Sequence, residues 1–257
     1  MDNLATSSDA EATPPTSECP DCGGIGYYLE KVVYGHPHFG VLFPCECKIP
    51  EKEQRAVEEL EKMSNLDAFR EKTFEAFNPN ISGVQRAFER AQRFARRPQG
   101  WLIFFGNYGC GKTHLAAAIA NEALRHHTRV LFAVVPDLLD HLRSTFGPSS
   151  ETEYDARFEQ IREAPVLILD DLGTESATPW AREKLFQIIN HRYNYSLPTV
   201  ITSNRAPKDI DPRILSRMSD RVLVEEHIMI DAADYRLLNT AQRVQRFPAP
   251  TARRRYQ

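Results

Sequence analysis

The sequence predicts an α/β fold in which a parallel β-sheet is covered by helices on both faces. Short runs of consecutive apolar residues alternate with longer segments whose apolar residues recur every three or four positions, as strands alternating with helices do. The strand-like runs are continuously apolar rather than alternating, which is typical of strands that are buried on both faces.

The region before this core divides into three parts. Residues 1–18 are rich in Ser, Thr, Pro and acidic residues and have little to bury, so we expect them to be disordered. Residues 19–50 hold four of the five cysteines and are expected to form a small zinc-binding module. Residues 51–83 are expected to be a helical linker, because one apolar stripe at helical spacing is formed by Ala56, Leu60, Met63 and Leu66.

The predicted core, residues 84–240, begins with a helix that runs from Val84 to Ala95 and ends at the breaker around Pro98. Apolar runs predict five strands, at 101–105, 130–135, 166–169, 199–202 and 221–224. Helices are expected between them, at 112–125, 137–146, 153–162 and 180–194. Residues 241–257 follow as a basic tail.

Composition limits the possible partners. Of the 257 residues, 42% are hydrophobic and 26% charged, a balance typical of soluble globular proteins. No apolar run approaches the roughly 18 residues of a membrane span, and the N-terminus lacks the features of a signal peptide. We therefore expect a cytoplasmic protein without a membrane partner.

The net charge is -3, so any contact with nucleic acid has to be local. Basic residues gather in two places: Arg86, Arg90, Arg93, Arg96 and Arg97 before the first strand, and Arg243, Arg246, Arg253, Arg254 and Arg255 in the tail. Such runs also occur as solvated helix faces and disordered ends, so they do not by themselves identify a DNA site.

The cysteines of the N-terminal module are candidate metal ligands. A CxxC turn and a later CxC pair are formed by Cys19, Cys22, Cys45 and Cys47. Four thiolates can form the closed tetrahedral site of a structural zinc ion, which a module with few large apolar residues would need in order to fold. His36 or His38 could replace one thiolate, and an iron–sulfur cluster or plain thiols are the alternatives to Zn²⁺.

A phosphate-binding loop is predicted directly after the first strand. It fits the pattern G-x-x-x-x-G-K-[ST] and consists of Gly106, Asn107, Tyr108, Gly109, Cys110, Gly111, Lys112 and Thr113. The glycines let successive backbone N–H groups face inward, and the helix that follows points its positive N-terminus at the phosphates. Lys112 is expected to reach the β- and γ-phosphates of ATP, and the Thr113 hydroxyl to bind Mg²⁺. His114, next in the chain, is a further candidate for nucleotide binding.

Two later strands end in polar residues that suit the same site. Asp170 is expected near Mg²⁺, and Asp171 is expected to orient or polarise the attacking water. Asn204, after the fourth strand, could donate a hydrogen bond to that water or to the γ-phosphate. Taken alone, such residues also serve as caps and turn formers; their position after a phosphate-binding loop favours catalysis.

Together these motifs resemble the DnaC/DnaI-type helicase loaders and the related IstB transposition ATPases, which belong to the AAA+ superfamily. The resemblance covers roughly residues 70–236 and rests on the segments 112–116, 167–175, 186–193 and 202–204. It implies an AAA+ P-loop NTPase core with a five-stranded parallel sheet in the order 5-1-4-3-2, and ATP bound between neighbouring subunits.

The resemblance also implies roles for single residues. Asn204 takes the sensor position, and Arg217 matches the arginine finger that reaches the γ-phosphate of the adjacent subunit; Arg213 is the weaker candidate. In a monomer both arginines would be surface residues. Arg236 resembles the second sensor. Asp171 stands where many AAA+ ATPases have Glu, which implies slow hydrolysis.

The function that the resemblance implies is ATP-dependent loading of a hexameric replicative DNA helicase onto single-stranded DNA. Residues 136–162 resemble the insertion by which this clade contacts single-stranded DNA, and an N-terminal zinc module resembles the part of loaders that grips the helicase. Two alternatives remain open: a transposition regulator that acts on duplex DNA, and a nucleotide-gated adaptor that binds partner proteins without hydrolysing ATP.

Overall fold

The computed structural model describes residues 64–144, 151–174 and 178–238, together with residues 22, 23, 25, 27–29, 32–34, 36 and 39–44. The chain divides into two compact units, Met1–Val57 and Glu58–Gln257. None of the helices in the described part of the chain has the length and apolar character needed to cross a membrane.

The N-terminal unit contains an antiparallel pair of short strands, β1 (Tyr27–Leu29) and β2 (Leu42–Pro44). Cys22 precedes β1 and is buried, and its carbonyl accepts a hydrogen bond from the Ile25 N–H at 3.2 Å. The other predicted zinc ligands, Cys19, Cys45 and Cys47, lie outside the described residues, as does His38. The residues that are described contain no group of three His, Cys, Asp or Glu that could hold a metal, so the zinc site stays a prediction.

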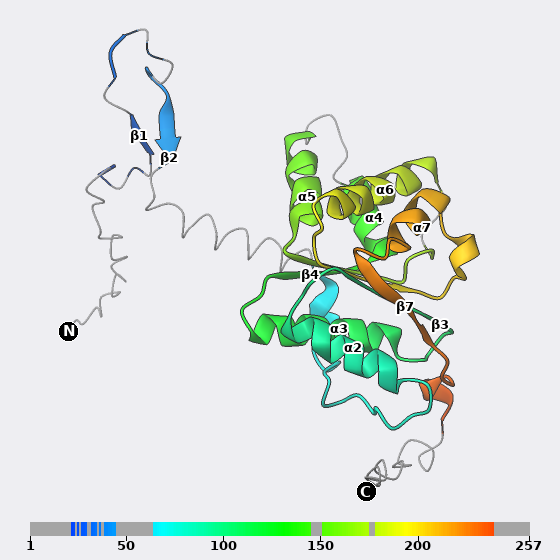
Figure 1. Ribbon diagram of the computed structural model, residues 1–257. Helices are drawn as coiled ribbons and strands as arrows, with labels where there is room; N and C mark the ends of the chain where they lie inside the picture. The colour runs from blue at the N-terminus through cyan, green and yellow to red at the C-terminus, as the bar shows by residue number, and fades with distance from the viewer. Residues whose placement is uncertain are drawn as a thin grey trace, which may run out of the picture. The chain divides into compact units, whose positions relative to one another are not determined.

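The second unit is built on a parallel sheet of five strands (Figure 1). They are β3 (Trp101–Gly106), β4 (Val130–Val134), β5 (Val166–Asp170), β6 (Thr199–Ser203) and β7 (Val224–Ile230). Their order across the sheet is β4-β5-β6-β3-β7. Counted along the chain this is 2-3-4-1-5, which is the predicted order 5-1-4-3-2 read from the other edge.

Helices cover both faces of this sheet (Figure 1). On one face lie α2 (Gln85–Arg96) and α3 (Lys112–Arg125); on the other lie α4 (Val135–Ser144), α5 (Glu151–Glu163), α6 (Pro179–Asn194) and α7 (Pro212–Met218). Successive strand residues point to opposite faces, so Ile103 packs in the cluster with α4–α7 and Phe104 in the cluster with α2 and α3. Because both faces are buried, β3 and β4 are apolar along almost their whole length, and the polar residues of β5 and β6, among them Asp170, Thr199 and Thr202, are buried.

The predicted fifth strand, 221–224, is wrong in position, since β7 begins at Val224 and runs to Ile230. The preceding residues form a turn in which the N–H groups of Val222 and Val224 donate to the Asp220 side chain and carbonyl, each at 2.8 Å. β7 is an edge strand that buries Ile228 and Ile230 and exposes Met229. It therefore lacks the continuous apolar run that identified the other strands, whose ends agree with the prediction to within two residues.

The predicted helical linker 51–83 is described from residue 64 onward, and there the only helix is the short 3-10 helix η2 (Asn65–Phe69). The rest runs in turns, one of them at Asn78, whose side chain accepts a hydrogen bond from the Asn80 N–H at 3.0 Å. Leu66 and Phe74 are buried in the cluster with α2 and α3. This segment thus packs against the core and reaches the carboxyl edge of the sheet.

Candidate nucleotide-binding site

The phosphate-binding loop connects β3 to α3 and depends on two glycines. Gly109 and Gly111 have φ angles of 69° and 100°, in the left-handed region that other residues avoid. A Cβ on Gly111 would lie 2.9 Å from the Phe77 ring, and a Cβ on Gly109 only 1.8 Å from Asp234 Oδ1. The backbone of the loop is therefore shaped as the motif predicts, and it lies directly against two other segments.

Lys112 is the first residue of α3 and is 7% exposed. Its Nζ donates hydrogen bonds to the carbonyls of Gly106 and Asn107, at 3.0 and 2.8 Å. The ammonium group is thus held inside the loop at the N-terminus of a helix, where backbone N–H groups and the helix dipole favour an anion. This is the position that the predicted phosphate contact requires.

Asp170 ends β5 and is 3% exposed. Its Oδ1 accepts a hydrogen bond from the Thr202 hydroxyl at 2.7 Å, and its carboxylate is also hydrogen bonded to the Thr113 side chain. Burial raises the pKa of Asp170, while the two hydroxyls act in the opposite direction. A carboxylate beside a hydroxyl is the hard oxygen set that Mg²⁺ prefers, so Asp170 and Thr113 fit the metal that accompanies a nucleoside triphosphate.

Asp171 has an unusual backbone and lines the same cavity as the loop. Its φ is 63°, a left-handed value that is costly for a residue with a side chain. The conformation is held by its N–H, which donates to Thr202 Oγ1 at 2.9 Å, and by its carbonyl, which accepts from Thr174 Oγ1 at 2.7 Å. Strain held in this way is common at functional sites, and it places Asp171 on the wall of the cavity with Lys112 and Thr113.

Asn204 follows β6, and both polar atoms of its side chain are buried without a hydrogen-bond partner among the described residues. A buried amide that lacks partners costs about 1–3 kcal/mol, so we expect a water, an ion or a ligand to supply its hydrogen bonds. The neighbouring Ser203 is fully engaged: its hydroxyl donates to the Leu172 carbonyl at 2.7 Å and accepts from the Arg205 N–H at 3.1 Å. Asn204 is not among the residues that line the cavity beside the loop, and its role as a sensor of the nucleotide stays a prediction.

A cavity of about 530 Å³ adjoins the loop. Its lining includes residues 108–114, Asp171 and Arg236, and an apolar wall to which Phe77, Ile81, Val84 and Ala232 contribute. An apolar wall beside a phosphate cradle suits the base and sugar of a nucleotide. The sequence reasoning missed this wall, because its residues come from irregular segments on either side of the core and follow no motif.

His114 and Arg236 both line this cavity. His114 Nε2 lies 2.9 Å from the Thr73 carbonyl, and its ring packs edge-on against Phe77. Burial lowers the pKa of His114. Its contacts therefore fix the apolar wall to α3. Arg236 lies in η4 (Tyr235–Leu237), which is joined to the loop by a hydrogen bond of 3.1 Å from the Tyr235 N–H to the Gly109 carbonyl.

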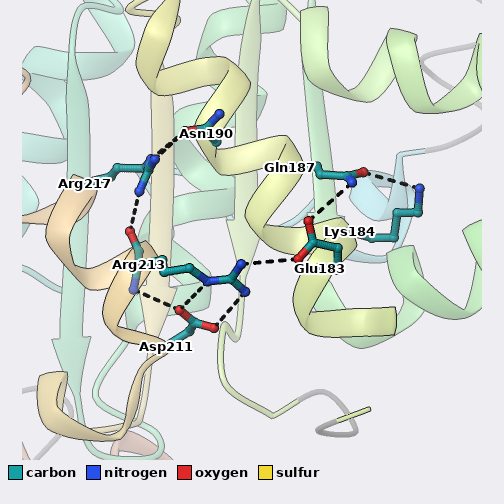
Figure 2. A network of polar contacts seen from close by, with 7 residues as sticks. All are labelled: Glu183, Lys184, Gln187, Asn190, Asp211, Arg213 and Arg217. Carbon is teal, nitrogen blue, oxygen red and sulfur yellow. Dashed lines mark hydrogen bonds and ion pairs between the residues drawn. The ribbon is translucent and has the colours of Figure 1, made fainter. Parts of the chain in front are cut away.

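Arg217 does not line the cavity. It extends from α7 toward α6, where Asn190 Oδ1 accepts hydrogen bonds from its Nε, at 2.8 Å, and from its Nη2 (Figure 2). Arg213 forms ion pairs with Glu183 and Asp211 at 3.2 and 3.3 Å. The structure thus places the predicted finger apart from the nucleotide site of its own chain.

Similarity to known proteins identifies the family and the fold of this chain. The profile of the family of IstB-like ATP binding proteins matches residues 45–243. The replicative helicase loader DnaI of Bacillus subtilis is 33% identical over 110 residues, which are 42% of this chain and 34% of DnaI. The replicative helicase loader DnaC of Escherichia coli is 27% identical over 153 residues, 58% of this chain and 62% of DnaC. An insertion-sequence protein of Mycobacterium tuberculosis is 28% identical over 201 residues, 74% of this chain and 78% of that protein.

The matched region thus spans about a third of DnaI and less than two thirds of DnaC. Among solved structures, the crystal structure of the DnaC helicase loader superposes with a TM-score of 0.54 at 25% identity and covers 63% of this chain and 97% of that one. The fold is therefore the α/β P-loop ATPase core of the AAA+ type. A family profile that extends over most of the described core, from the phosphate-binding loop through β7, shows that the chain belongs to the IstB-like ATP binding proteins.

Proposed function

We propose that this chain is an ATPase that loads a hexameric replicative helicase onto single-stranded DNA, with ATP binding and hydrolysis as the switch. The observation that carries the nucleotide part is the orphaned amide of Asn204, buried beyond β6, and the hydrogen bond from Thr202 to Asp170 supports it. The helicase part is supported by the two relatives that are named as replicative helicase loaders.

The nucleotide would be bound by groups of the phosphate-binding loop and of the adjoining cavity. Backbone N–H groups of the loop and the ammonium of Lys112 would hold the triphosphate, and the apolar wall around Phe77 would hold the base. Thr113 and Asp170 would hold Mg²⁺, which when bound neutralises charge on the phosphates. Thr202 orients the Asp170 carboxylate for that purpose through its 2.7 Å hydrogen bond.

Hydrolysis needs a group that orients water and a group that responds to the γ-phosphate. Asp171 supplies a carboxylate on the cavity wall, and Asn204 supplies an amide that can donate or accept a hydrogen bond. Arg217 would act on the nucleotide of a neighbouring subunit, so turnover requires self-association through the ATP site. Since Asp is shorter than the usual Glu, hydrolysis should be slow and stimulated by assembly on DNA.

Lys112→Ala tests the proposal. The variant should lose ATP binding, because the phosphates lose the cation held inside the loop, and it should lose ATP-dependent capture of the cell's own replicative helicase. Calorimetry with Mg²⁺ and ATP measures the first effect, and a pull-down of purified helicase with and without ATP measures the second. Thr128→Ala, a change away from the site, is the control. Wild-type protein that binds ATP but not the helicase would refute the loading part alone.

A second candidate function is regulation of transposition on duplex DNA. It is favoured by the insertion-sequence protein of Mycobacterium tuberculosis, which matches over 74% of this chain, more than either loader does. Binding to labelled duplex and single-stranded DNA, each with Mg²⁺ and ATP, separates the two functions. Preference for the duplex would support the transposition role. Phosphate release that stays at background on both DNAs would instead indicate an adaptor without turnover.

A further inference from the structure

One face of α6 forms a cradle for the Arg217 side chain. Phe186, Asn190 and Tyr193 are spaced four and three residues apart and so lie on the same side of the helix. The guanidinium carbon of Arg217 lies 4.7 Å from the centre of the Phe186 ring and 5.6 Å from that of Tyr193. Tyr193 is itself fixed by a hydrogen bond from its hydroxyl to Asp220 at 2.5 Å. The cradle therefore restricts the direction in which Arg217 points.

The hydrogen bonds of Arg217 leave part of its guanidinium available. Nε and Nη2 donate to the same Asn190 oxygen, and Nη1 donates to the Arg213 carbonyl at 2.8 Å (Figure 2). A guanidinium has five N–H donors, so two remain after these three contacts are counted over the described residues. Two N–H groups are what bidentate contact with phosphate oxygens requires.

Arg217 and its neighbour Arg213 differ in the charge of their hydrogen-bond partners. Arg213 is paired with two carboxylates, those of Asp211 and Glu183. The acceptor that holds Arg217, the Asn190 amide, carries no charge. A neutral acceptor orients the guanidinium without neutralising it, so its positive charge remains for a phosphate.

We propose that Asn190 is a positioning residue that aims Arg217 at the nucleotide of a neighbouring subunit, and that its neutrality is essential to this role. The inference rests on the proposed function, since it requires ATP to be hydrolysed between subunits. Asn190 acts only through Arg217 and touches no reacting atom. Glu183 and Arg213, in the same network, have no part in turnover.

Two substitutions at position 190 test this proposal in the full-length protein with ATP, Mg²⁺ and DNA. Asn190→Asp keeps the shape of the side chain but pairs Arg217 with a negative charge; Asn190→Ala removes the acceptor. Both should lower kcat by roughly ten- to hundredfold, the scale that misplacement of a catalytic group produces, with ATP affinity unchanged. Glu183→Gln, about two turns away on the same helix, is the matched control and should leave kcat unchanged.

Mixing of subunits distinguishes positioning from a general structural defect. Lys112→Ala subunits cannot use ATP but carry an intact Arg217 and its cradle. When they are added to Asn190→Asp subunits, hydrolysis should exceed the sum of the separate rates, because the nucleotide of an Asn190→Asp subunit then meets an undamaged finger. A mixture that shows only the sum would overturn the positioning role.

The remaining outcomes are also decisive. Wild-type kcat in Asn190→Asp, together with loss of turnover in Arg217→Ala, would overturn the role of Asn190 and leave the proposed function intact. Normal turnover in Arg217→Ala would overturn the intersubunit site itself, and this inference with it. A loss of turnover in Glu183→Gln would point to Arg213 as the finger and would likewise overturn the proposal.

Discussion

The Asp170 carboxylate is buried in the folded chain, where only 3% of the residue is exposed. Because burial raises its pKa above the ordinary value of 3.8, the folded protein retains this proton to higher pH than the unfolded chain does. Stability without nucleotide therefore falls as the pH rises from 3.8 through the raised pKa, and the full cost is present above that pKa.

Asp170→Asn should accordingly stabilise the nucleotide-free protein while abolishing Mg²⁺-dependent hydrolysis. We expect a rise in Tm of about 2–4 °C at pH 7, which corresponds to about 1 kcal/mol in a domain of this size. The difference should shrink as the pH approaches 3.8, because both side chains are then neutral. Thermal unfolding at several pH values measures it, and a Tm below that of the wild type at pH 7 would contradict the argument.

Single residues also show where sequence reasoning reaches its limit. The phosphate-binding loop, Asp170 and Asn204 could be predicted from the sequence because each lies at or just after the end of a strand. The carboxyl ends of parallel strands lie together at one edge of the sheet. The hydrogen bond from Thr202 to Asp170 could not be predicted without knowing that β5 pairs with β6. The contact between Asn190 and Arg217 depends on how α6 packs on α7, which no local pattern encodes.

At the scale of elements, Arg192 joins α6 to the beginnings of two strands. It is fully buried, and its guanidinium donates to the carbonyls of Arg162, Ala164 and Pro198 and to the Thr199 hydroxyl. Burial lowers the pKa of Arg192 to about 9, which leaves it charged at neutral pH. These acceptors lie just before β5 and at the start of β6, at the ends of the strands opposite the turns that carry Asp171 and Asn204.

Arg192→Met should destabilise the protein by about 3 kcal/mol, because the backbone carbonyls that accept from Arg192 would stay buried without a hydrogen-bond donor. Arg182→Met, at an exposed position of the same helix, should change stability by no more than about 0.5 kcal/mol. Urea unfolding monitored by circular dichroism compares the two variants. Equal effects would show that the contacts of Arg192 contribute little.

Elements differ in how well the sequence predicts them. The strands β3–β6 and the helices α2–α6 agree to within two residues, because burial on both faces, helical spacing and, for α6, the Thr178 cap leave local signals. The short helix α7 was not predicted. The edge strand β7 and the segment 64–83 were misjudged because their structure follows from contacts with distant parts of the chain. Leu66 and Phe74, for example, are buried against α2 and α3 rather than against neighbours in sequence.

At the scale of the whole molecule, nucleotide binding should raise the thermal stability of the protein. A ligand that binds only the folded state at a hundred times its Kd adds about 2.7 kcal/mol. For this chain that amounts to a rise in Tm of roughly 5–10 °C with Mg²⁺ and ATP. Lys112→Ala should show no rise. Differential scanning fluorimetry measures the shift, and an equal shift in both proteins would place the binding elsewhere.

The two ends of the sheet are held in different ways. At the end where β5 and β6 begin, Arg192 and the indole N–H of Trp101, which donates to the Leu197 carbonyl at 3.1 Å, fasten the strands to the helices around them. At the other end the strands run into the turns that carry Asp171 and Asn204. The Thr202 and Ser203 hydroxyls fasten this end too, by donating to Asp170 Oδ1 and to the Leu172 carbonyl, so we expect the sheet to present both turns to a nucleotide without rearrangement of its strands.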